Sequence, residues 1–138
     1  MEQKDKELLL KDLSARLSYG VICNTPKGDG HLNSINQTIF DVELGINVDA
    51  VHRDTFKLEN CKPYLRPMSS MTEEEKIQLS QYACIGEDLN GEFIDEVQRK
   101  DCATYVDWLN KNMFDYRDLI LKGLALEAPE GMYTLKVR

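Results

Sequence analysis

The chain has 138 residues, of which 42% are hydrophobic and 30% are charged, and its formal net charge is −7. These values exclude a disordered chain and predict one domain, residues 1–138, with a sizeable buried core. The densest apolar cluster, Leu8–Leu10, is far shorter than the roughly 20 residues that span a bilayer, and no signal-type segment opens the sequence, so we expect a cytoplasmic protein without a membrane partner.

Residues 1–18 contain a predicted amphipathic helix that runs from Lys4 to Leu17. Charged residues separate leucines that recur at helical spacing and would lie against a core, namely Leu9, Leu10, Leu13 and Leu17. Gly20 follows, and glycine readily adopts the left-handed conformation that ends many helices.

Residues 19–66 are predicted to form a small β region. Turn-forming residues at 25–30 separate a short β-prone run, 19–23, from a second run that extends from His31 to Leu44. An alternation typical of a half-buried strand places Thr38, Phe40, Val42 and Leu44 on one face and Asp41, Glu43 and Gly45 on the other. With weaker strands at 48–58, we expect a small antiparallel sheet or partly closed barrel of four or five strands.

The segment Lys62–Pro67 is predicted to be extended, because each proline fixes its own φ and disfavours helix in the residue before it. It is either a strap between sheet and helix or a polyproline-type ligand. Thr72 and Glu75 have the spacing of a capping box, which predicts the start of a helix. The inward face of that helix would carry Leu79, Tyr82 and Ala83.

Residues 67–138 are predicted to be mainly helical, as a group of about three short helices. Residues 85–100 fit either a short strand or a turn of helix. Asp101 is the expected N-cap of a helix that Phe114 ends and whose inward face carries Cys102, Tyr105, Val106, Leu109 and Met113.

A further short helix is predicted from Asp115 and Asp118, with Leu119 and Ile120 inside it and Gly123 at its end. The tail, residues 132–137, is either an edge strand or a loose end. Together these elements predict an α+β fold with an N-terminal helix, a small sheet and a C-terminal helical group.

Negative charge is concentrated in the second half of the chain. Residues 1–67 contain nine Lys and Arg against ten Asp and Glu, a net charge of −1, whereas residues 68–138 contain eight against fourteen, a net charge of −6. Such a surface repels phosphate backbones and argues against a nucleic-acid partner. It either meets a basic protein or keeps the chain in solution.

Two long blocks of the sequence resemble a known family. They read KPYLRPMSSMTEEEK at 62–76 and WLN…FDYR…KGLALEAPEGMY at 108–133. The blocks are similar to a family of uncharacterised proteins of gut Bacteroidales, often found in prophage-like or other mobile-element regions. The resemblance implies a mobile-element context and brings no established activity or cofactor. The family commonly carries two His where this chain has Asn112 and Met113, so a role of that pair in metal binding does not carry over.

The residues that carry chemistry are dispersed. The four cysteines, Cys23, Cys61, Cys84 and Cys102, form no Cys-x-x-Cys pair and are expected to be reduced and mostly buried, although Cys61 has a cation beside it in Lys62. A metal site from His31, His52 and a cysteine lacks ligand-like spacing. The acids that offer a nuclease-like cluster, Asp41, Glu43, Asp49 and Asp54, have no nearby lysine. We therefore expect neither an enzyme nor a cofactor.

Binding to another protein is the function that the sequence favours. The candidate protein-binding residues are Trp108, Tyr116 and Arg117, because Trp, Tyr and Arg dominate protein interfaces. Trp108 lies one position off the apolar stripe, which leaves core packing open, whereas Tyr116 and Arg117 would be exposed at a helix start. The hypothesis is a non-enzymatic accessory protein of a mobile element. The alternatives are nucleic-acid association through the barrel, or a hydrolase whose site forms only in the folded chain.

Overall fold

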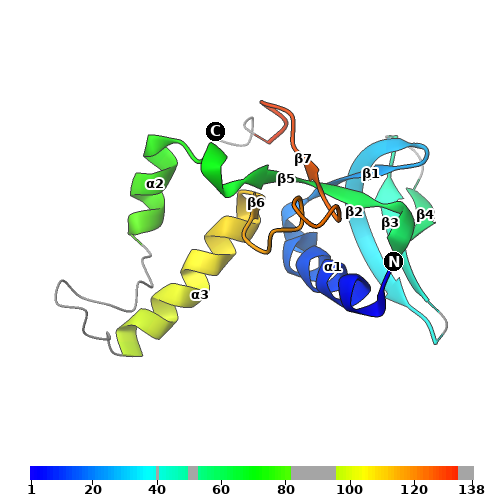
Figure 1. Cartoon of the computed structure of the whole chain (residues 1–138), viewed down its shortest axis with the longest axis horizontal. Helices are drawn as coiled ribbons and strands as arrows, with labels where there is room; N and C mark the ends of the chain where they lie inside the picture. Colours follow the sequence, from blue (N-terminus) through cyan, green and yellow to red (C-terminus); the bar gives the residue numbers. More distant parts are fainter. Residues whose placement is uncertain (40, 50–52, 82–95, 134–138) are drawn as a thin grey trace.

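The described part of the chain runs from a helix through a series of strands into a second helical region (Figure 1). The structure, a computed structural model, describes residues 1–39, 41–49, 53–81 and 96–133, the last range with side chains from residue 103 onward. The α-helices are α1 (Gln3–Arg16), α2 (Glu73–Ser80) and α3 (Glu96–Lys111). The strands are β1 (Ile22–Thr25), β2 (Gly28–Gln37), β3 (Val42–Asn47), β4 (Arg53–Lys57), β5 (Lys62–Pro67), β6 (Phe114–Asp115) and β7 (Leu126–Glu127).

The expected first helix is confirmed as α1, which lies against one face of the sheet (Figure 1). Leu9 and Leu13 are fully buried in the main core cluster, together with apolar side chains of β1, β2 and β3. A 3-10 turn extends the helix as far as Tyr19, and Gly20 ends that turn at a φ of +74°. The glycine therefore has the left-handed role that its position indicates.

The sheet is mixed and follows the order β4-β3-β2-β1-β5-β6, with β7 also beside β5. Neighbours from β4 to β5 are antiparallel, whereas β6 and β7 run parallel to β5. The α+β fold class is thus confirmed. A barrel is not confirmed, because pairing among the described strands follows a path from β4 to β6 that does not close on itself.

The strand expected through residues 38–44 is interrupted by a turn. The backbone N–H of Thr38 donates to the carbonyl oxygen of Asp41 at 2.8 Å, and the Thr38 hydroxyl accepts from the Asp41 N–H at 3.0 Å. β2 therefore ends at Gln37 and β3 begins at Val42. These hydrogen bonds form a turn, although the alternation of residues predicted one continuous strand.

The segment Lys62–Pro67 is extended, as predicted, and it is itself a strand of the sheet, β5. Its first two residues pair with β1, in the register Cys23 with Pro63 and Asn24 with Lys62. Its later residues pair with β6 and β7. This strand therefore joins the antiparallel sheet to the two C-terminal strands.

The capping box that starts α2 is confirmed. Thr72 Oγ1 accepts from the N–H of Glu75 at 3.1 Å, and the Glu75 carboxylate accepts from the N–H of Thr72 at 3.0 Å. On this helix Leu79 is buried, as expected, whereas Tyr82 and Ala83 lie outside the described residues.

The next helix, α3, begins earlier than expected. It already includes residue 96, so Asp101 lies inside the helix and is not its N-cap. Leu109 is buried and Tyr105 is half-buried, whereas Val106 is 37% exposed and the prediction that it faces inward is wrong. The side chain of Cys102 lies outside the described ones.

The residues after α3 form strand and turns instead of a further helix. Phe114 and Asp115 form β6, which pairs with the end of β5. The Asp115 carboxylate accepts from the backbone N–H groups of Leu119 at 2.9 Å and Ile120 at 3.0 Å. This carboxylate therefore stabilises a turn, and the prediction that Asp115 and Asp118 start a helix is wrong. Of the tail, Met132 and Tyr133 are described, and residues 134–138 are not.

Two groups of buried apolar side chains hold these elements. The main cluster lies between α1 and the sheet and also takes in Leu124, Ala125 and Tyr133 from the C-terminal segment. The second cluster consists of Leu79, Leu109 and Phe114, and we call α2, α3 and β6 around it the helical lobe. None of the helices in the described ranges is long and apolar enough to cross a membrane.

Candidate functional site

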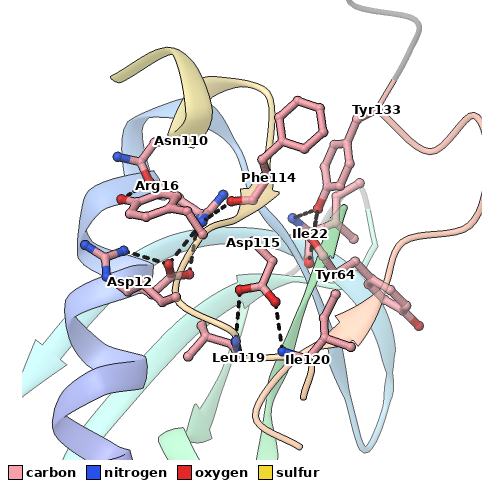
Figure 2. Close-up of polar contacts among 12 residues, drawn as sticks. Asp12, Arg16, Ile22, Tyr64, Asn110, Phe114, Asp115, Leu119, Ile120 and Tyr133 are labelled. Carbon is pink, nitrogen blue, oxygen red and sulfur yellow. Dashed lines mark hydrogen bonds and ion pairs between the residues drawn. The ribbon is translucent and has the colours of Figure 1, made fainter. Parts of the chain in front are cut away.

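A buried charge cluster joins α1 to the segment that follows α3. Arg16 donates to Asp12 through Nε at 2.9 Å and Nη2 at 3.1 Å, and Arg117 Nη1 donates to the same carboxylate at 2.8 Å. Asp12 and Arg16 are fully buried. Arg16 Nη2 also donates to the carbonyl oxygen of Phe114 at 2.6 Å (Figure 2). Because a buried carboxylate without its cations is costly, this cluster fixes the lobe to the first helix.

The aromatic ring of Tyr116 packs against both arginines of this cluster. The guanidinium carbons of Arg16 and Arg117 lie 5.5 Å and 4.6 Å from its ring centroid. Its hydroxyl donates to Asn110 Oδ1 at 2.9 Å. One nitrogen of Arg16, Nη1, is buried without a hydrogen-bond partner among the described residues. Apart from this nitrogen, the polar groups of the cluster find partners within the protein.

A second ion pair connects β5 with the start of α2. Arg66 donates to the Glu75 carboxylate through Nη1 at 2.8 Å and Nη2 at 2.7 Å. Burial opposes ionisation of Glu75, but hydrogen bonds from Arg66 and Thr72 outweigh it and hold the pKa of this carboxyl below its ordinary value. The Arg66 guanidinium also lies 4.1 Å from the ring centroid of Phe114. Phe114 in turn stacks on Trp108, with ring centroids 5.7 Å apart.

These contacts locate the three residues predicted to bind a protein. Trp108 is half-buried and packs against the cluster of the helical lobe. Tyr116 and Arg117 are half-buried as well, and they lie in a turn region, so the prediction of an exposed pair at a helix start is wrong. The structure brings Tyr116 and Arg117 together with Asp12 and Arg16, a partnership that sequence spacing does not reveal.

Burial determines the environment of the two described cysteines. Cys23 and Cys61 are free and buried. Cys61 is buried, as the sequence predicted, and burial raises its pKa to about 11 although Lys62 follows it in the chain. Burial likewise raises the pKa of Cys23. Because the thiolate is the nucleophile, neither thiol suits nucleophilic catalysis at neutral pH.

The candidate metal ligands do not converge within the described part of the chain. No group of three or more His, Cys, Asp or Glu side chains that suits a metal ion occurs there. His31 Nδ1 lies 3.0 Å from the carbonyl oxygen of Gly20, and His52 lies outside the described residues. Among the acids, Asp41 belongs to the β2–β3 turn. Asp54 forms an ion pair with Lys27 at 3.5 Å, so the expectation that no lysine lies near these acids is wrong.

The surface feature that the sequence did not predict lies on the helical lobe. Ile77 on α2 is 63% exposed, and Val106 on α3 is 37% exposed. Met68, in the turn before α2, is 38% exposed. In the sequence, Val106 has helical spacing with Leu109, and that spacing wrongly predicted that its side chain faces inward.

The chain matches no family model, and it has no significant match among curated proteins or solved structures. Function is therefore inferred from the arrangement of its own side chains. Within the described residues, that arrangement offers exposed apolar side chains on the helical lobe and two internal ion-pair clusters.

Proposed function

We propose that this protein is a non-enzymatic accessory protein of a mobile element and that it binds another protein through its helical lobe. The observation that carries the proposal is the exposure of large apolar side chains, Ile77 and Val106, on helices that have only a small core between them. Binding of another protein to the lobe would bury these side chains. The resemblance of two sequence blocks to proteins of mobile elements supports the proposed genetic context.

The charge of the lobe indicates what kind of protein would bind. Glu73 and Glu74 are exposed in the first turn of α2, whereas Glu75 is already paired with Arg66, and the second half of the chain carries most of the net negative charge. Opposite charge accelerates association and disfavours wrong partners. The partner is therefore expected to present a basic surface with an apolar centre.

The three predicted contact residues have different places in this proposal. Trp108 lies on α3 within the lobe and is half-buried against its apolar cluster, so it is a candidate contact there. Tyr116 donates to Asn110 and Arg117 donates to Asp12, so both side chains are held by contacts within the protein. Replacing Arg117 would therefore affect binding indirectly, through the position of the lobe.

A pull-down from host lysate with three variants tests the proposal. Ile77→Asp and Val106→Asp place a charge in the proposed contact and are expected to abolish capture of the partner. Ile39→Asp is the matched control, because Ile39 is 91% exposed and lies at the β2–β3 turn, away from the lobe. Each variant is first checked for an unchanged circular dichroism spectrum and unfolding midpoint.

Capture that survives both lobe substitutions would contradict the proposal. A gel-shift titration with the same proteins addresses the alternative. Binding to nucleic acid that weakens steeply with added salt would favour nucleic-acid association instead. Loss of capture by the two lobe variants, with Ile39→Asp unaffected and no gel shift, is the result that the proposal requires.

A further inference from the structure

The helix α2 contacts the described part of the protein through one narrow face. Of its residues, Leu79 is buried and Glu75 is half-buried, and the others are exposed. These two residues are four positions apart, so they lie on the same side of the helix. Leu79 packs with Leu109 and Phe114 in the cluster of the helical lobe. A helix of eight residues is too short to be stable by itself in water, so α2 depends on contacts such as these.

The Glu75 carboxylate contributes to this attachment in two ways. Its Oε1 accepts from the Thr72 N–H at 3.0 Å, which completes the capping box, and also from Arg66 Nη2 at 2.7 Å. Its Oε2 accepts from Arg66 Nη1 at 2.8 Å. Within the described residues, Arg66 of β5 is the residue through which α2 forms hydrogen bonds with another element. Loss of this carboxylate therefore weakens the helix cap and removes the link to β5 together.

The main core cluster contains no residue of α2. Arg66 is held independently of the helix, because its N–H donates to the Met113 carbonyl oxygen at 2.7 Å and its guanidinium lies 4.1 Å from the Phe114 ring centroid. Withdrawal of α2 takes Leu79 out of the second cluster and leaves Leu109 and Phe114 in it. The cost of such an opening is therefore confined to the lobe, and local openings of this kind need less free energy than global unfolding.

We propose that α2 docks on the lobe and undocks from it as a unit, and that the Glu75 carboxylate holds it in the docked state. This inference rests on the proposed function in one respect. Because Ile77 belongs to α2 and Val106 to α3, undocking breaks up the proposed contact surface. The docked state is the one that binds, so the apparent affinity for the partner falls with the fraction of molecules in which α2 is docked. Glu75 is a positioning residue of that surface.

Hydrogen–deuterium exchange of the free, full-length protein measures the undocking without any partner. The amides of α2 are followed beside those of β2 and β3 in wild type, Glu75→Ala and Glu74→Ala. Glu75→Ala removes both contacts of the carboxylate and is expected to speed exchange in α2 roughly tenfold, with β2 and β3 unchanged. Glu74→Ala is the matched control, because it removes the same charge from an exposed position in the same helical turn. Its exchange rates should stay close to those of wild type.

Capture of the partner, in the pull-down used for the lobe variants, is the second readout. Glu75→Ala is expected to capture less partner than Glu74→Ala, although both variants keep Ile77 and Val106. This loss would follow from the position of α2, since neither substitution alters the apolar side chains of the contact.

The two readouts separate the possible failures. Equal exchange in α2 for Glu75→Ala and Glu74→Ala would overturn the role of Glu75. Exchange that rises equally in α2, β2 and β3 would mean that the helix opens only when the whole protein unfolds, and would also overturn the proposal. Faster exchange in α2 with unchanged capture would overturn its control of binding. Capture that survives Ile77→Asp and Val106→Asp would instead contradict the proposed function, and exchange in the free protein would still decide whether α2 undocks.

Discussion

Asp12 links two arginines that are far apart in the sequence. It accepts hydrogen bonds from Arg16, four residues away, and from Arg117, 105 residues away. The pairing with Arg16 follows from helical spacing and is readable in the sequence. The pairing with Arg117 depends on how β5 and β6 bring the chain back to α1, and no local pattern encodes it.

Substitution of Asp12 tests the importance of this cluster. Asp12→Asn would leave two arginines without their shared anion, one of them fully buried, and we expect a loss of about 3–5 kcal/mol in the free energy of unfolding. Urea denaturation measures this value. Glu7→Gln removes an exposed acid from the same helix and is the control. Equal stability of the two variants would show that the cluster contributes little.

The pair of Arg66 and Glu75 predicts a pH dependence of stability. The folded-state pKa of Glu75 lies below its ordinary value of 4.5, so the pair stabilises the fold fully above pH 4.5 and loses its effect as the pH falls through the lower, folded-state pKa. The difference in unfolding free energy between wild type and Glu75→Gln should therefore shrink as the pH is lowered from about 6 to about 3. Glu74→Gln, at an exposed neighbouring position, should show no such trend. A difference that is constant with pH would contradict this interpretation.

At the scale of elements, the connection from α3 to β6 and the turn after β6 adopt unusual backbone conformations. Met113 has a φ of +62° and Asp118 has a φ of +59°, values that favour glycine. Met113 is fully buried, whereas Asp118 is exposed. Burial therefore compensates the backbone cost at Met113, and the described contacts show no comparable compensation at Asp118.

Substitution by glycine should change the stability of the protein in opposite directions at these two positions. Asp118→Gly removes the steric cost and is expected to be neutral or to stabilise the protein by up to about 1 kcal/mol. Met113→Gly removes the same cost but also a fully buried side chain, so we expect a loss of about 2–4 kcal/mol. Thermal unfolding of both variants measures the difference. A marked loss of stability in Asp118→Gly would mean that its side chain has a structural role.

Local sequence signals predicted some elements and not others. The capping box at Thr72 and Glu75 involves residues three positions apart, so its geometry could be predicted directly. The alternation around residues 38–44 predicted a strand wrongly, because the Thr38 hydroxyl bonds to the backbone of Asp41 and forms a turn. Asp115 looked like a helix start for a related reason: a carboxylate that accepts backbone N–H groups serves a turn as well as a helix.

At the scale of the whole molecule, β5 connects the sheet with the helical lobe. It pairs with β1 at one end and with β6 at the other, and its Arg66 reaches α2 through Glu75. The parallel pairing of β5 with β6 and β7 could not be predicted, because it joins residues far apart in the sequence. Exposure of Val106 could not be predicted either, since helical spacing alone does not tell which apolar residues meet a core.

Hydrogen–deuterium exchange of the full-length protein, alone and with the captured partner, tests the proposed binding surface most directly. If the helical lobe is the contact, exchange should slow in α2 (Glu73–Ser80) and in residues 103–111 of α3, and the rates in β2, β3 and β4 should not change. Protection confined to those three strands, with α2 and α3 exchanging as in the free protein, would contradict the account.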